Sequence, residues 1–247
     1  MLFRSTDAAA QARRGTAAPR IDYEVRPTGL VPVFPERLAC EPIASGWGSA
    51  ERFDGSARLQ GRNSGKHGGL DISLKEGTPI LAAAAGQVIA RGEGGQLEGI
   101  YLWIQHLQAD TGLPYRTISK YQHLSQIPAW NVGDRVAAGQ VVARSGMTGT
   151  RGPAFGPDGY PHLHWSLFVL PEDKAPQGGA LPPVPPREGT LSDPLLLFLP
   201  PTTDIDKVFD LPDSAKRIPV GVADASGRIE PAGRRVVWPV ACTDRTR

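Results

Sequence analysis

The 247-residue chain has little of several residue types, and each shortage narrows the class of protein it can belong to. It contains two cysteines and five histidines, and its formal net charge is only +2. Two cysteines cannot build a cysteine-rich zinc site, and a near-neutral charge gives no overall basic field for nucleic acid. No apolar run approaches the roughly 20 residues of a membrane-spanning helix. The sequence therefore predicts neither a nucleic-acid-binding protein nor one with a transmembrane helix.

Two further shortages concern export and disulfide pairing. Residues 1–20 are rich in Ala and Arg and lack the apolar core of about 7–15 residues that marks a secretory signal. Such a signal was trimmed, the natural start is elsewhere, or the protein uses another route. Cys40 and Cys242 stand near opposite ends of the chain, so they form either a disulfide or two unrelated thiols, depending on the redox compartment.

Glycine and proline, by contrast, are abundant, with 29 and 24 residues. They favour a turn-rich, mostly β protein over a helical bundle. Runs with the β-branched and aromatic content of strands lie at 100–106, 117–124 and 162–170. Glycine turns separate such short strands about every 8–12 residues, which predicts an antiparallel β fold.

The same patterns divide the chain into three parts. Residues 1–40 show no sustained periodicity and predict an extended N-terminal arm. Residues 41–200 hold the strands and predict the main domain. Residues 201–247 are too few for a strong core of their own, so we expect a C-terminal extension packed on the main domain.

Three of the possible metal ligands fall into a pattern that suits zinc. His162 and His164 are two apart on a predicted strand, so their imidazoles point to the same face. His67 and Asp71 are four apart, and Gly68 and Gly69 between them let the backbone curl so that both side chains reach one point. With His164 as the third ligand, a tetrahedral zinc site keeps one position open, which is the catalytic arrangement.

The two remaining site histidines suit hydrolysis. An open zinc position holds water, whose pKa falls to roughly 7. Of His123 and His162, one imidazole can accept the proton of the attacking water, and the other, when protonated, can stabilise an oxyanion or protonate the leaving amine. His106 ends a strand and has no motif around it, so we interpret it as a structural histidine.

Three motifs occur in an order that resembles the lysostaphin/LytM-type zinc endopeptidases, which cut peptides of bacterial peptidoglycan. They are His67-Gly68-Gly69-Leu70-Asp71, Tyr121-Gln122-His123-Leu124 and His162-Leu163-His164. The resemblance runs from about Ile43 to Leu199 and includes Ser45-Gly46-Trp47-Gly48 before the first motif. Each short motif is common, but their ordered combination is specific.

The resemblance implies that His67, Asp71 and His164 bind one Zn2+ ion and that His123 and His162 form the catalytic pair. It also implies a twisted antiparallel β-sheet groove of the duplicated hybrid motif fold. The substrate implied is the peptide stems or cross-bridges of peptidoglycan, which places the protein in the cell envelope, periplasmic or secreted. Four aromatic residues are candidates for lining the groove, although strand aromatics more often belong to a core. They are Trp47, Tyr121, Phe155 and Tyr160.

Two departures from the family pattern bear on the site. The segment from Gly149 to His162 is longer than the usual link, and we expect it to form a groove wall that alters substrate choice. Ser166 stands where the family commonly has a glutamate, so we expect a looser contact beside the metal ligand. The alternative function is a non-catalytic binding or activating module of the same fold. Such relatives typically lose metal ligands, whereas this chain keeps all three, which favours an enzyme.

Overall fold

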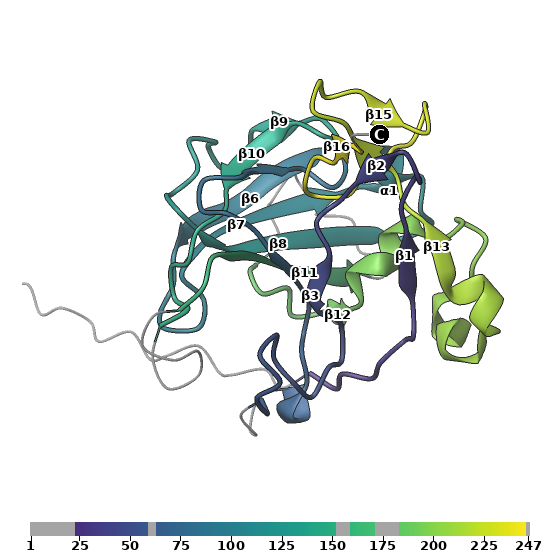
Figure 1. The fold of residues 1–247 in the computed structure, drawn as a ribbon, viewed down its shortest axis with the longest axis horizontal. Coiled ribbons are helices and arrows are strands. Elements are labelled where there is room, and N and C mark those ends of the chain that lie inside the picture. Colours follow the sequence, from purple (N-terminus) through teal and green to yellow (C-terminus); the bar gives the residue numbers. More distant parts are fainter. Residues whose placement is uncertain (1–22, 59–62, 152–158, 171–182, 246–247) are drawn as a thin grey trace, which may run out of the picture.

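A computed structural model describes residues 23–58, 63–151, 159–170 and 183–245 (Figure 1). The structure is mostly β, with 37% strand and 11% helix, which confirms the predicted fold class. Within the described ranges, no helix combines the length and the apolar content needed to cross a membrane.

The described strands are between two and nine residues long, and the helical segments are short. The strands are β1 (Val31–Val33), β2 (Leu38–Ala39), β3 (Ile43–Ser45), β4 (Leu70–Ser73), β5 (Pro79–Leu81), β6 (Gly86–Glu93), β7 (Ile100–His106), β8 (Arg116–Leu124), β9 (Arg135–Val136), β10 (Val141–Arg144), β11 (His162–Leu170), β12 (Thr190–Ser192), β13 (Arg217–Pro219), β14 (Val222–Ala223), β15 (Ile229–Glu230) and β16 (Thr243–Asp244). The helical segments are α1 (Gln108–Thr111) and 3-10 turns at Asn63–Gly65, Pro194–Phe198, Ile205–Asp210 and Asp213–Lys216.

One antiparallel sheet positions the candidate site. Its strand order is β3-β4-β11-β8-β7-β6-β9, and β12 also pairs with β11. The long strands β6, β7 and β8 run side by side through the middle of the molecule (Figure 1). Because β11 lies between β4 and β8, His164 stands opposite Asp71 on one side and Gln122 on the other.

The two faces of β11 contact different parts of the protein because side chains alternate along a strand. Leu163, Trp165 and Leu167 enter the main hydrophobic core, where Trp165 meets Trp238 edge to face with 6.0 Å between ring centroids. The opposite face holds the histidines and continues into a second, smaller apolar cluster that includes Phe168. Strand β11 thus joins the core to the site.

Strands from the N-terminal and C-terminal parts of the described chain pair with each other. Strand β1 pairs in parallel with β13, and β2 pairs antiparallel with β16 (Figure 1). A disulfide joins Cys40 to Cys242 across a sequence separation of 202, which decides between the two alternatives left open by the sequence. The tail also contributes the buried Trp238 to the main core. The division into arm, main domain and extension stays a prediction.

Candidate metal centre

The three predicted metal ligands lie together. His67 comes from the loop before β4, Asp71 from β4 and His164 from β11, and their ligand atoms all lie within 4.8 Å of one another. Asp71 Oδ1 is 3.1 Å from His67 Nε2 and 2.8 Å from His164 Nδ1, and the two nitrogens are 3.0 Å apart. The three inward-facing atoms therefore form a small triangle.

The glycines between His67 and Asp71 are needed for space. A Cβ on Gly69 would lie 2.5 Å from the Trp165 carbonyl oxygen and 2.8 Å from His164 Nε2. A Cβ on Gly68 would lie 2.5 Å from the Asn63 side-chain nitrogen. Neither glycine has the positive φ that favours glycine, so close approach of β11 accounts for Gly69 and close approach of the Asn63 side chain accounts for Gly68.

The hydrogen bonds behind the triangle make all three inward-facing atoms acceptors. His67 Nδ1 lies 3.0 Å from the Gly46 carbonyl oxygen, which can only accept, so the ring proton is on Nδ1. The Ser166 hydroxyl donates to the Gly68 carbonyl at 3.0 Å and therefore accepts from His164 Nε2 at 2.9 Å. His67 Nε2 and His164 Nδ1 thus both present lone pairs, as does the carboxylate oxygen.

Three lone pairs pointing at one another across about 3 Å repel unless a cation lies between them. Two imidazole nitrogens and one carboxylate oxygen are a donor set that zinc accepts, with one tetrahedral position left open. The residues present therefore fit a zinc ion. The His164 side chain is 17% exposed, so solvent reaches this cluster.

Asp71 is held as a carboxylate. Its second oxygen lies 3.3 Å from Nη2 of Arg58, which also donates to the Ser45 hydroxyl at 2.7 Å. Burial acts to raise the pKa of Asp71, but His67 and His164 outweigh it and hold this pKa well below its usual range. No sequence pattern predicts Arg58, because it precedes the first motif by nine residues. Ser166, which the sequence places beside the predicted ligand, lies two residues after His164 on the same strand face.

The two predicted catalytic histidines lie beside the triangle. The rings of His123 and His162 have centroids 4.6 Å apart, and His162 Nε2 is 3.7 Å from Asp71 Oδ1. His123 Nδ1 lies 2.8 Å from the Thr148 carbonyl oxygen, and His162 Nδ1 lies 3.0 Å from that of Tyr160. Each ring therefore carries its proton on Nδ1 and offers the lone pair of Nε2.

Burial sets the charge of these imidazoles. It lowers the pKa of His162, and it lowers that of His123 well below the usual value, with the nearby imidazoles of His162 and His164 adding to the effect. Burial also lowers the pKa of His164 to about 4. In the metal-free protein at neutral pH all three rings are therefore neutral.

A β-bulge turns His123 toward the site. Between Tyr121 and Leu124, strand β8 has one residue more than the facing Ile100–Leu102 of β7, and His123 has φ 62°. The bulge breaks the two-residue alternation, so Tyr121 and His123 do not share a face. Tyr121 is instead fully buried in the core, and its hydroxyl accepts the Ala83 N–H at 2.8 Å. The prediction that Tyr121 lines a substrate groove is therefore wrong.

The other three aromatic candidates have different places. Trp47 is half-buried, and its indole N–H donates to the Arg26 carbonyl at 2.8 Å. Phe155 lies outside the described residues. Tyr160 does lie at the site, where its ring stacks on His162 with 4.0 Å between centroids. The Ser166 hydroxyl contacts the predicted ligand His164 directly, at 2.9 Å from Nε2.

His106 has the structural role expected from the sequence. Its ring is fully buried, with Nδ1 2.7 Å from the Ala85 carbonyl oxygen and Nε2 2.9 Å from the Ser119 hydroxyl. Burial lowers its pKa to about 4. Both ring nitrogens are thus occupied within the sheet, and His106 is not part of the metal cluster.

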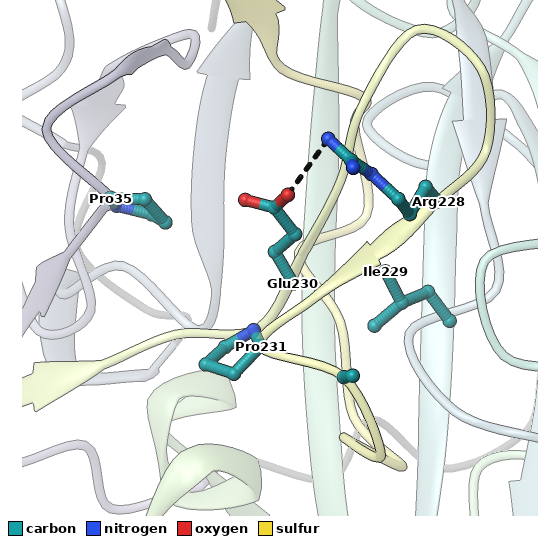
Figure 2. A pocket seen from close by; sticks show the side chains of 6 residues that line it. Pro35, Arg228, Ile229, Glu230 and Pro231 are labelled. Atoms are coloured by element: carbon teal, nitrogen blue, oxygen red, sulfur yellow. Dashed lines mark ion pairs between the residues drawn. The ribbon is translucent and has the colours of Figure 1, made fainter.

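A separate surface pocket lies between the N-terminal segment and the C-terminal hairpin (Figure 2). The guanidinium of Arg228 pairs with Glu230 at 3.0 Å along its edge. It shares no residue with the metal cluster, and its lining consists of Pro35, Arg228, Ile229, Glu230, Pro231 and Ala232.

The comparison with known proteins agrees with the geometry of the candidate metal centre. Residues 65–176 match the sequence profile of Peptidase family M23, and this range contains the triangle and both neighbouring histidines. The chain is 35% identical over 106 residues to a metalloprotease of Haemophilus influenzae, covering 42% of this chain and 18% of the relative. It is 34% identical over 113 residues to the glycyl-glycine endopeptidase ALE-1 of Staphylococcus capitis, covering 44% and 26%.

Among solved structures, the catalytic domain of lysostaphin from Staphylococcus simulans is similar to this chain. The sequence identity is 27%, the match covers 51% of this chain and 80% of that one, and the TM-score is 0.38. The chain spans only 18% and 26% of the length of the two relatives compared above.

Proposed function

We propose that this chain is a zinc metalloendopeptidase that hydrolyses peptide bonds in bacterial peptidoglycan, and the match of residues 65–176 to Peptidase family M23 supports this proposal. One observation carries the proposal. Three acceptor atoms, from His67, Asp71 and His164, converge within 3.1 Å of one another, and two neutral imidazoles lie beside them. Such an arrangement suits a bound cation with two bases next to it.

The roles proposed for the residues follow from their protonation. A bound zinc ion supplies Lewis acidity, which makes water more acidic and polarises a peptide carbonyl. His123 and His162 each offer Nε2 as an acceptor, so either ring can take the proton of the attacking water. The same ring, once protonated, can deliver that proton to the leaving amine. The carbonyls of Thr148 and Tyr160 keep the acceptor nitrogens turned inward throughout.

The proposed substrate and location rest on separate observations. Names of relatives, glycyl-glycine endopeptidase and lysostaphin, support peptide stems or cross-bridges of peptidoglycan as the substrate class. The Cys40–Cys242 disulfide supports an oxidising compartment, which agrees with a periplasmic or secreted protein of the cell envelope. Residues 41–200 are proposed as the catalytic domain, with 201–247 as the extension packed on it.

Digestion of purified peptidoglycan, followed by mass spectrometry of the fragments, tests the proposal. Zinc-loaded protein should release peptide fragments, and a chelator should stop the release. His123→Ala should abolish hydrolysis while the zinc content stays near one ion per chain, because His123 is not one of the three ligands. If the zinc-loaded wild type binds peptidoglycan without releasing fragments, the chain is a non-catalytic binding module instead.

A further inference from the structure

The ring of Tyr160 lies between two other aromatic rings. It is nearly parallel to His162, with an interplanar angle of 9° and 4.0 Å between centroids. Phe53 also contacts it, with 3.8 Å between centroids and an angle of 38°. Two rings this close to the same ring cannot share one face, so Phe53 and His162 lie on opposite faces of Tyr160. Phe53 is 46% exposed and closes the stack on the solvent side.

Tyr160 makes a further contact with His162 through its backbone. Its carbonyl oxygen accepts the Nδ1 proton of His162 at 3.0 Å. Pro161 separates Tyr160 from His162 and fixes its own φ near −65°, which limits how far the two residues can move relative to each other. Tyr160 thus contacts the proposed base His162 through both its ring and its backbone carbonyl.

We propose that Tyr160 is a positioning residue, which holds the His162 ring with Nε2 facing the metal triangle, and that Phe53 holds Tyr160 in place from outside. The inference rests on the proposed function for its kinetic consequence, but the ring placement itself does not depend on hydrolysis. A substrate-binding aromatic needs a free face, whereas both faces of Tyr160 are covered. Its role is therefore to orient His162.

The experiment compares Tyr160→Ala, Tyr160→Phe and Phe53→Ala with the wild type. In zinc-free and zinc-loaded protein, nitrogen NMR should show one His162 tautomer, with the proton on Nδ1, in the wild type and in Tyr160→Phe. Tyr160→Ala should keep this tautomer, because the backbone carbonyl of residue 160 still accepts Nδ1–H, but its His162 signals should shift and broaden, because the ring has lost its stacking partner. Phe209→Ala is the matched control, since Phe209 is a partly buried aromatic in the tail that packs under Arg26.

The kinetic result should separate positioning from substrate contact. Displacing a catalytic ring by about 1 Å can cost roughly 100-fold in rate, so Tyr160→Ala should lower kcat by about 10–100-fold with little change in KM. Phe53→Ala should act in the same direction but more weakly, and Phe209→Ala should change neither kcat nor the His162 signals. A rise in KM alone, or wild-type His162 signals in Tyr160→Ala, would overturn the inference.

Failure of the proposed function and failure of the positioning role give different results. If the wild type does not hydrolyse peptidoglycan, the proposed function fails while the NMR comparison still decides whether Tyr160 orients His162. If Tyr160→Ala does not fold, Tyr160→Leu and Phe53→Ala take its place, because leucine keeps most of the buried volume and Phe53 is largely outside the core. Wild-type His162 signals in both variants would then refute the positioning role.

Discussion

Replacing Ser166 by alanine should weaken zinc binding without changing any ligand atom. In the wild type, the Ser166 hydroxyl accepts the Nε2 proton of His164 and so leaves Nδ1 as the acceptor that faces Asp71. Without the hydroxyl, a buried Nε2–H has no acceptor, because residue 166 is only 4% exposed and water has little access. The proton then moves to Nδ1, where Asp71 Oδ1 accepts it at 2.8 Å.

The size of the effect follows from these two tautomers. A buried donor left without a partner costs about 1–3 kcal/mol, and removing a group that orients a metal ligand typically costs about 10–100-fold in affinity. The second figure corresponds to about 1.4–2.7 kcal/mol, so the two agree. We expect the dissociation constant for zinc to rise by about 10–100-fold in Ser166→Ala.

Competition with a chromogenic chelator at neutral pH measures this dissociation constant directly. Ser119→Ala is the matched control, because Ser119 is also buried in the sheet and its hydroxyl also contacts a histidine, the structural His106, at 2.9 Å. This control should lose stability but keep its zinc affinity. Ser166→Thr keeps the hydroxyl and should restore most of the affinity. Equal zinc affinity in Ser166→Ala and wild type would refute the tautomer argument and the ligand role of His164 Nδ1.

Two further predictions concern stability. His106 has a pKa of about 4 in the folded protein against 6.5 in the unfolded chain, so the unfolded chain binds the proton first and stability is lost as pH falls from 6.5 towards 4. His106 alone should lower the free energy of unfolding by about 3 kcal/mol over this range. In urea unfolding of chelator-treated protein, the free energy of unfolding of His106→Gln should therefore depend less on pH than that of the wild type. Reducing the Cys40–Cys242 disulfide, which closes a very long loop, should lower the free energy of unfolding by about 2–5 kcal/mol in urea. An unchanged urea midpoint would show that the bridge does not stabilise the fold.

The residues that converge at the candidate metal centre could be predicted from the sequence because they follow simple local patterns. His162 and His164 share a strand face by the two-residue repeat, and their antiparallel neighbour β4 supplies Asp71 opposite His164. The mostly β class followed in the same way from glycine turns and strand-like runs. These features depend on residues that are close together in the sequence, so a short motif is sufficient to predict them.

Tyr121 shows where such periodicity fails. It precedes His123 by two residues, so a regular strand would place both side chains on one face. The extra residue in β8 and the positive φ of His123 reverse that alternation, and Tyr121 enters the core. The bulge depends on how β8 pairs with β7, so the sequence of β8 alone does not predict it. Arg58 was missed for a similar reason, since only the folded chain brings it to Asp71.

The tautomers of the four site histidines are fixed by two kinds of hydrogen-bond acceptor, which are backbone carbonyls for three of them and a side-chain hydroxyl for one. Three of the four site histidines donate Nδ1–H directly to a backbone carbonyl, so the fold itself fixes their tautomers. No substitution that preserves the fold can remove those acceptors. His164 differs, because Ser166 stands between its ring and the backbone. The one ligand tautomer that a single side-chain change can reverse is therefore that of His164, and this makes Ser166 the most informative residue to replace.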